Sequence, residues 1–139
     1  MLILDTNVLS ELMRPVPDAQ VLDWAQTKNR DEVYTTAINE AEILYGLELL
    51  PKGKKRDELM LAVEATFYRD MAGHILEFDS DAARTYAQIA ASRRKRGRPI
   101  SYSDAQIAAI VQSHGAMLAT RDVSDFAECG IRTVNPWKK

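Results

Sequence analysis

Cysteine and histidine are scarce in this chain of 139 residues, which holds one cysteine and two histidines. A single cysteine, Cys129, excludes an internal disulfide framework and is typical of a reducing, cytoplasmic setting. We interpret Cys129 as a small apolar filler of the core. His74 and His114 lack the spacing of metal ligands, so we expect each to be a surface or loop residue.

Long apolar runs and nucleotide-binding patterns are missing as well. No stretch approaches the roughly 18 apolar residues of a membrane span, and the start, MLILDTNVLSEL, has no basic region or cleavage site of a signal peptide. Neither the P-loop pattern nor GxGxxG occurs. We therefore expect a cytoplasmic protein with no membrane contact and no nucleotide cofactor.

Charge of either sign is not in large excess, because the formal net charge is −2. That balance argues against a broad cationic surface, yet the basic residues are clustered. One block comprises Lys52, Lys54, Lys55 and Arg56, and the other comprises Arg93, Arg94, Lys95, Arg96 and Arg98. Cations in the last turn of a helix complement its dipole, which accounts for two or three of the second block. Contact with the phosphates of a nucleic acid is an equally open interpretation of that block.

Short apolar segments alternate with helical ones along the chain. Strands are expected at residues 2–4, 33–36, 75–78, 117–119 and 132–134, and helices at 7–13, 18–28, 38–50, 54–71, 80–96 and 103–114. This alternation predicts one α/β domain over residues 1–139, with a mainly parallel sheet of about five strands flanked by helices. Ligands bind at the carboxyl ends of such strands, where Asp5 and Asp122 lie.

Two further acids fall on helices. Asp104 lies within about 60° of Ile107, Ala108 and Val111 around its predicted helix, in the middle of an apolar stripe. The alternative is that Asp104 occupies the first turn and merely interacts favourably with the positive end of the helix dipole. Glu42 borders a stripe formed by Ile38, Tyr45 and Leu49, which we expect to be buried, although a partly exposed glutamate fits that position almost as well.

Four converging carboxylates would repel one another strongly. Each pair at ~4 Å costs about 4 kcal/mol at an effective dielectric constant near 20. Either some of the acids stay protonated or a divalent cation lies between them. Oxygen ligands without a histidine or cysteine cluster favour Mg²⁺ or Mn²⁺ over Zn²⁺.

The order and spacing of the acids resemble those of the PIN-domain ribonucleases, specifically the VapC-type toxins of type II (VapBC) toxin–antitoxin modules. The resemblance spans essentially the whole chain, through LILDTNVLSEL, INEAEILYGL, SYSDAQIAAIVQSHGAMLATRDVSDF and the closing NPW. It implies a single PIN domain with a three-layer fold. It also implies a catalytic and metal-binding quartet of Asp5, Glu42, Asp104 and Asp122, with Asn7 and Thr120 orienting those acids and Asp125 as a further acid.

The resemblance carries expectations about activity and partners. It implies an endoribonuclease that depends on Mg²⁺ or Mn²⁺, with Asp5 and Asp104 as direct ligands, and association into a homodimer. Helix 38–50 has a second apolar face, Ile43, Leu44, Leu47 and Leu50, so it is either buried on all sides or docks a partner. The partner that the resemblance implies is a cognate antitoxin, whose helix would lie in a groove beside this one.

Two other interpretations stay open. A phosphatase that uses Asp5 as a nucleophile would need DxD after the first strand, but the second position is Asn7. The other is a non-catalytic α/β module, either receiver-like or purely partner-binding. A receiver would carry a lysine after a late strand, where this chain has Thr120, Arg121 and Asp122. Trp137 in NPW is expected to pack the tail against the domain rather than to bind a base.

Overall fold

The computed structural model describes residues 1–138 and has one five-stranded sheet at its centre. The strands lie in the order β3-β2-β1-β4-β5, and every neighbouring pair is parallel. They are β1 (Leu2–Leu4), β2 (Val33–Thr36), β3 (Ile75–Leu76), β4 (Met117–Ala119) and β5 (Arg132–Val134). The expected mainly parallel α/β sheet is confirmed.

The sheet winds outward from β1 in both directions. β2 and β3 follow on one side of it, while β4 and β5, which come late in the chain, follow on the other. Leu4 lies opposite Ala119, so β1 and β4 end at the same height. A strand order that reverses between two neighbours opens a crevice at their carboxyl ends, where ligands of α/β sheets bind.

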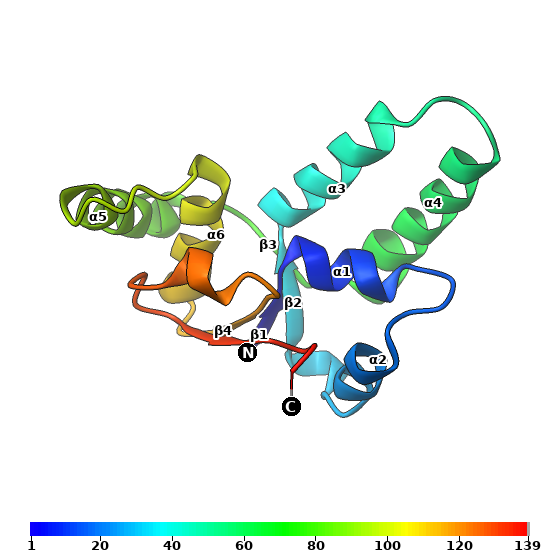
Figure 1. The fold of residues 1–139 in the computed structure, drawn as a ribbon, viewed down its shortest axis with the longest axis horizontal. Helices are drawn as coiled ribbons and strands as arrows, with labels where there is room; N and C mark the ends of the chain where they lie inside the picture. Colours follow the sequence, from blue (N-terminus) through cyan, green and yellow to red (C-terminus); the bar gives the residue numbers. More distant parts are fainter. Residues whose placement is uncertain (139) are drawn as a thin grey trace.

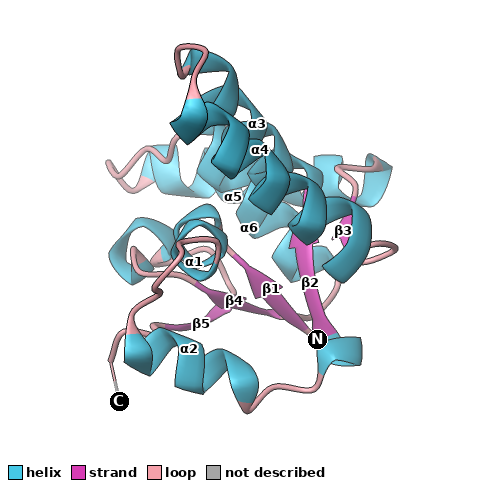
Figure 2. Ribbon diagram, turned by 90° about the vertical axis from the view of Figure 1, so that its right-hand side faces the viewer, coloured by secondary structure: helices cyan, strands magenta, loops and turns pink. Residues whose placement is uncertain are grey.

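Helices cover both faces of the sheet, with α5 and α6 on one side and α1, α3 and α4 on the other (Figures 1 and 2). The helices are α1 (Thr6–Leu12), α2 (Ala19–Gln26), α3 (Ala37–Leu49), α4 (Lys54–Ala65), α5 (Ser80–Lys95) and α6 (Tyr102–Ser113). Ile3 packs into the first core, which lies under α5 and α6. Its neighbour Leu4 packs into the second core, which lies under α1, α3 and α4. Successive side chains of a strand point to opposite faces, so β1 serves both cores.

Most element bounds agree with the sequence expectations, and two differ. The helix expected over 54–71 is α-helical only to Ala65 and continues as a π-helical turn, η2 (Thr66–Asp70). The wider turn buries Phe67 in the second core. The strand expected at 75–78 pairs only over Ile75–Leu76. Short 3-10 turns, η1 (Arg30–Glu32) and η3 (Val123–Phe126), precede β2 and follow β4.

The expectation about the faces of α3 was wrong in one respect. Tyr45 and Leu49 are each 66% exposed, whereas Asn39, Ile43 and Leu47 are buried. Glu42 therefore borders an exposed apolar stripe instead of a buried one. Two apolar stripes on one helix look alike in sequence, and only packing decides which of them is covered. Among residues 1–138 no helix is both long and apolar enough to cross a bilayer.

Candidate active site

Asp5 is the buried centre of the candidate site, and its side chain is fixed by donors from three elements. It caps α1 by accepting a hydrogen bond from the Thr6 N–H at 2.9 Å, and its own N–H donates to the Ala119 carbonyl. Asn39 Nδ2 donates to Asp5 Oδ1 at 2.9 Å, and Thr120 Oγ1 donates to Oδ2 at 2.7 Å. Asp5 is 7% exposed, so its carboxylate is held in one orientation at the crevice.

From Asp5 a chain of hydrogen bonds runs to Glu42. Asn39 lies in the first turn of α3, where Thr36 Oγ1 donates to its Oδ1 and accepts from its N–H. The amide of Asn39 also donates to Thr6 Oγ1 at 2.9 Å. Thr6 Oγ1 in turn donates to Glu42 Oε1 at 3.2 Å. The start of α3 thus places Glu42 beside the buried aspartate.

A second chain runs from Asp5 to Asp122. Thr120 Oγ1, which donates to Asp5, also accepts a hydrogen bond from the Asp122 N–H at 3.0 Å. Asn7 Nδ2 donates to Asp122 Oδ2 at 3.0 Å, and Asn7 Oδ1 accepts from the Arg121 N–H at 3.2 Å. Asn7 therefore contacts Asp122, and Thr120 contacts both Asp5 and Asp122.

Asp104 reaches the site from the opposite layer. It lies in the first turn of α6, and its N–H donates to the capping Ser101 Oγ at 3.2 Å. Ile107, Ala108 and Val111 are completely buried, so the predicted apolar face of this helix is confirmed. Asp104 stands half-buried where that face meets the crevice.

The acids perturb one another's protonation. Burial raises the pKa of Asp5, Glu42 and Asp104 above the usual carboxylate range. Repulsion by neighbouring acids raises these pKa values further: Asp122 acts on Asp5, and Asp5 and Asp104 act on Glu42. Asp104 is repelled by Asp5, Asp125 and Asp122. Carboxyl pKa values that are raised together in one crevice are typical of functional sites.

The donor set fits a hard divalent cation in its chemistry. All the donors are carboxylate, amide or hydroxyl oxygens, the ligands that Mg²⁺ and Mn²⁺ prefer. Within residues 1–138 no three acidic, histidine or cysteine side chains yet stand close enough to hold an ion between them. Asp5 is fixed by its donors, but Glu42 and Asp122 are exposed and can change rotamer to approach a cation.

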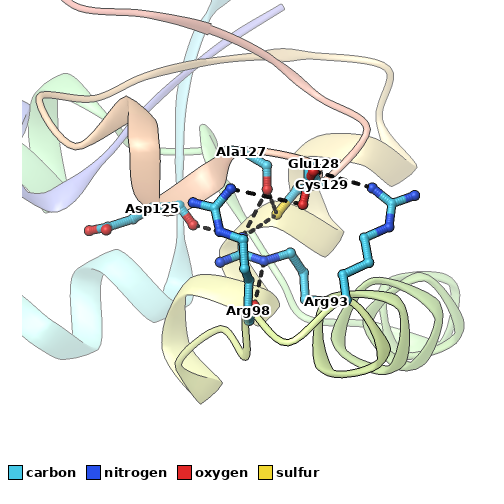
Figure 3. Close-up of polar contacts among 7 residues, drawn as sticks. Arg93, Arg98, Asp125, Ala127, Glu128 and Cys129 are labelled. Carbon is cyan, nitrogen blue, oxygen red and sulfur yellow. Dashed lines mark hydrogen bonds and ion pairs between the residues drawn. The ribbon is translucent and has the colours of Figure 1, made fainter.

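The basic block of residues 93–98 does not act as one surface. Arg94 and Lys95 are exposed, while Arg96 and Arg98 each lie within 4.0 Å of a Glu128 carboxylate oxygen. Arg93 is only 5% exposed and donates its hydrogen bonds to backbone carbonyls (Figure 3). The expectation that Arg93 contacts RNA was therefore wrong, because its guanidinium is buried and already bonded.

Four residues set aside from the site lie as their chemistry suggests. Cys129 is free, buried and part of the first core, as expected of a filler. Trp137 packs against the second core, as expected of the tail. His114 is exposed, and His74 is half-buried with its ring stacked on Tyr34.

Asn39 is the polar residue of the site that sequence reasoning missed. It is completely buried, and its side chain bridges Asp5, Thr6 and Thr36. Its spacing of four residues from Ile43, a residue of the buried face, was the available signal. A buried asparagine needs partners for its amide, and here those partners are in the site.

Comparisons of the sequence and of the fold with known proteins both find similar proteins over nearly the whole chain. A family profile described as PIN domain matches residues 2–130. The chain is 41% identical over 138 residues to "VapC ribonuclease Y4jK" of Sinorhizobium fredii, covering 99% of both chains. It is 39% identical over 137 residues to "Toxin FitB" of Neisseria gonorrhoeae, again covering 99% of both.

Solved structures resemble this one closely. The crystal structure of FitAcB from Neisseria gonorrhoeae superimposes with a TM-score of 0.92 at 38% identity, covering all of both chains. The structure of FitAB bound to the IR36 DNA fragment gives the same TM-score and identity, covering 100% of this chain and 97% of the other.

Proposed function

This chain belongs to the PIN-domain family, and from that membership we infer that it is a metal-dependent endoribonuclease acting as the toxin of a toxin–antitoxin pair. Relatives named as VapC ribonuclease, as toxin and as "tRNA(fMet)-specific endonuclease VapC" support this function. The observation that carries the site assignment is the hydrogen-bond network around Asp5, which joins it to Glu42 and to Asp122.

We assign the four acids different tasks within one site. Asp5 is the fixed ligand, because three donors hold both of its oxygens. Asp104, which approaches from the opposite layer, is the second direct ligand. Glu42 is exposed and has a raised pKa, which suits it to accept a proton from the attacking water. Asp122, held by Asn7, orients that water or an outer ligand.

The cofactor that fits this donor set is Mg²⁺ or Mn²⁺. When bound, such an ion supplies Lewis acidity toward a phosphate oxygen and lowers the pKa of water. The protein's own part is to hold Asp5 rigidly and to keep Glu42 and Asp104 close enough to feel each other's charge. Their repulsion favours a cation over an empty site.

Phosphate contacts beyond the acids come from the exposed part of the basic block. Arg94 and Lys95 have free access to solvent, and the ion pairs of Arg96 and Arg98 with Glu128 are partly exposed and open to exchange. These four cations offset the repulsion that an acidic crevice exerts on a polyanion.

Cleavage of RNA by the purified chain, freed of any partner, tests this function. We expect cleavage in Mg²⁺ or Mn²⁺ that EDTA abolishes. Asp5→Asn and Asp104→Asn should remove it, while the matched control Asp23→Asn, an exposed acid on α2, should not. Cleavage that persists in EDTA, or in both site variants, would contradict the proposal.

A phosphatase that uses Asp5 as nucleophile is disfavoured by the residue two positions later in the chain. Such an enzyme would need a second carboxylate there, but Asn7 occupies the position, and its Nδ2 donates a hydrogen bond to Asp122 Oδ2 at 3.0 Å. A non-catalytic module is disfavoured because a purely structural role does not explain why several acids with raised pKa values share one crevice.

The groove between α1, α3 and α4 is the surface that we assign to the antitoxin. It has a volume of about 600 Å³ and an apolar floor that includes Met13, Leu47 and Leu59. Thr6 and Glu42, which belong to the hydrogen-bond network around Asp5, also line this groove. A segment lying in the groove would therefore pass beside the candidate active site, which gives an inhibitor access to the acids.

Gly46 allows a clean test of that docking surface. It lines the groove, and nothing lies within 4 Å of the position that a Cβ would occupy. Gly46→Trp should therefore fold and cleave RNA but resist rescue when a cognate antitoxin is co-expressed. Glu64→Trp, exposed on α4 outside the groove lining, is the matched control. Rescue of both variants would contradict the assignment of the groove to the antitoxin.

The homodimer that the sequence resemblance implies is a separate prediction. Sedimentation velocity of the purified chain would test it.

A further inference from the structure

Arg93 is a buried cation that bonds to backbone carbonyls instead of a carboxylate. Its Nε donates to the Arg98 carbonyl at 2.7 Å, and its Nη1 donates to the carbonyls of Asp125 and Ala127 at 3.0 and 2.9 Å. The same Nη1 lies 3.5 Å from Cys129 Sγ. Within residues 1–138 no carboxylate stands within 4.0 Å of its guanidinium.

These carbonyls belong to the two segments that carry acids of the site. Arg98 lies in the connection that leads into α6 and so to Asp104. Asp125 belongs to η3, the turn directly after Asp122. In Figure 3 the Asp125 carbonyl faces the guanidinium of Arg93, while its carboxylate points away. One side chain at the end of α5 therefore ties both segments together.

The tie opposes an electrostatic force. Asp104 is repelled by Asp125 and by Asp122, which lie on the other tied segment. Without a restraint, like charges on two surface segments would move apart into solvent. The planar fork of an arginine can hold several carbonyls at fixed directions, which a lysine cannot do.

We propose that Arg93 is a positioning residue that holds Asp104 and the turn carrying Asp122 and Asp125 at the spacing needed to share one divalent cation. The inference rests on the proposed metal site. Residues that orient the ligands of a metal typically change its affinity by 10- to 100-fold. Arg93 would orient the acids through its hydrogen bonds to main-chain carbonyls of the segments that carry them.

Binding of Mn²⁺ to metal-free protein, measured by titration calorimetry, tests the role of Arg93 without relying on cleavage. Arg93→Met should fold, as judged by circular dichroism, and bind Mn²⁺ at least tenfold more weakly. Arg93→Lys, which keeps the charge, should recover only part of that loss. Arg84→Met, an exposed arginine earlier on α5, should bind like the parent chain.

Parent-like affinity in folded Arg93→Met would overturn the proposal, because the residue would then be merely structural. If that variant does not fold, Arg93→Lys decides the matter, and parent-like affinity there would overturn it equally. A parent chain that binds no Mn²⁺ would refute the proposed metal site itself, a result distinct from weak binding confined to the variants.

A separate observation concerns Arg121, which lies between Thr120 and Asp122. Its guanidinium carbon stands 4.7 Å from the centre of the Trp137 ring. Trp137 is itself fixed, because its side chain packs against the second core and its backbone N–H donates to Asn135 Oδ1 at 2.9 Å. The Arg121 side chain is exposed, and no carboxylate within residues 1–138 lies within 4.0 Å of it.

An exposed cation held on an aromatic ring beside an acidic crevice suits an anionic ligand. Stacking on Trp137 lowers the rotamer entropy that Arg121 would lose on binding. A guanidinium can donate two parallel hydrogen bonds to one phosphate. We infer that Arg121 binds a backbone phosphate of single-stranded RNA next to the cleaved bond; this inference rests on the proposed ribonuclease function.

Fluorescence anisotropy with a labelled uridine oligonucleotide of about 12 nucleotides, in an Asp5→Asn background that prevents cleavage, tests this contact. Loss of one phosphate contact in Arg121→Ala should weaken binding and reduce the slope of log affinity against log salt by about 0.7. Arg121→Lys should keep the slope. The control is Arg132→Ala, which removes an exposed arginine at the amino end of β5.

An unchanged affinity and salt slope in Arg121→Ala would overturn the inference. A variant that binds RNA normally but is no longer rescued by its partner protein would overturn it too, since Arg121 would then contact protein. Absence of RNA binding in every chain would instead contradict the proposed function.

Discussion

The Thr120 hydroxyl is expected to stabilise the ionised form of Asp5, and a Thr120→Val variant removes that hydroxyl with little change of shape. Thr120 is completely buried, and its Oγ1 donates to Asp5 Oδ2 at 2.7 Å. A hydrogen bond to a charged group contributes about 1.5–3 kcal/mol, and one to a neutral group about 0.5–1.5 kcal/mol. The loss should therefore be about 2 kcal/mol when Asp5 is ionised and about 1 kcal/mol when it is protonated.

The sign of the pH dependence follows from the pKa of Asp5. Burial raises that pKa in the folded chain above its ordinary value, so Asp5 costs stability as the pH rises through the folded pKa. The Thr120 hydroxyl lowers the pKa and limits this cost. Its removal raises the pKa further, so the variant should lose more stability at neutral pH than at about pH 3, below the ordinary aspartate pKa of about 3.9, where Asp5 is protonated in the folded and unfolded chain alike.

Urea unfolding of the metal-free chain, followed by circular dichroism at both pH values, measures the difference. A loss of about 2 kcal/mol near neutral pH corresponds to a drop of about 8 °C in Tm for a domain of this size. Thr120→Ser is the control, because it keeps the hydroxyl and loses one methyl group, about 0.8 kcal/mol at either pH. Equal losses for Thr120→Val at the two pH values would refute the reasoning.

Four other outcomes can be measured. The three acids with raised pKa values favour the protonated state in the fold, so the metal-free Tm should fall from mildly acidic to neutral pH, and Mn²⁺ should reverse that fall; a Tm that rises with pH in EDTA would contradict this. Ile107→Ala, at a completely buried core position, should lower the free energy of unfolding by about 2–5 kcal/mol in a urea titration. Gly130→Ala should destabilise by about 1–2 kcal/mol, because its φ is +69° and the new Cβ would meet Gln112 Nε2 at 2.6 Å. Gly46→Ala, with open space in mid-helix, should stabilise by about 0.5–1 kcal/mol.

The fold could be predicted from short-range patterns because each element carries its own signal. The strands at Val33–Thr36 and Met117–Ala119 have the bounds that their apolar runs predicted. Proline, glycine and capping residues marked most helix ends. The π-helical turn at Thr66–Asp70 was missed, because the extra residue in that turn is fixed by the packing of Phe67 and leaves no local pattern.

The acids of the candidate site could be predicted from the sequence, but the burial and hydrogen bonds of the residues around them could not. Asp104 stood out because an acid on an apolar face is unusual. Glu42 was placed beside the correct stripe, but that stripe was expected to be buried, since the sequence could not show that Tyr45 would be exposed. Arg93 looked like its basic neighbours in sequence, and only the carbonyls of a turn more than 30 positions away show that its guanidinium is bonded inside the protein.

The hydrogen bonds between the segments that follow β1 and β4 also determine at what stage of protein synthesis the site can form. Asp5 and Thr120 are 115 positions apart, as are Asn7 and Asp122. A nascent chain on the ribosome therefore carries its first acid long before β4 has been made to dock beside β1. Thr120 and Asp122 follow β4, so the acids can assemble into one site only after that strand has been translated. A translation product that lacks β4 would hold an unfinished site, so cleavage of the cell's own RNA is deferred until β4 has been made and has docked.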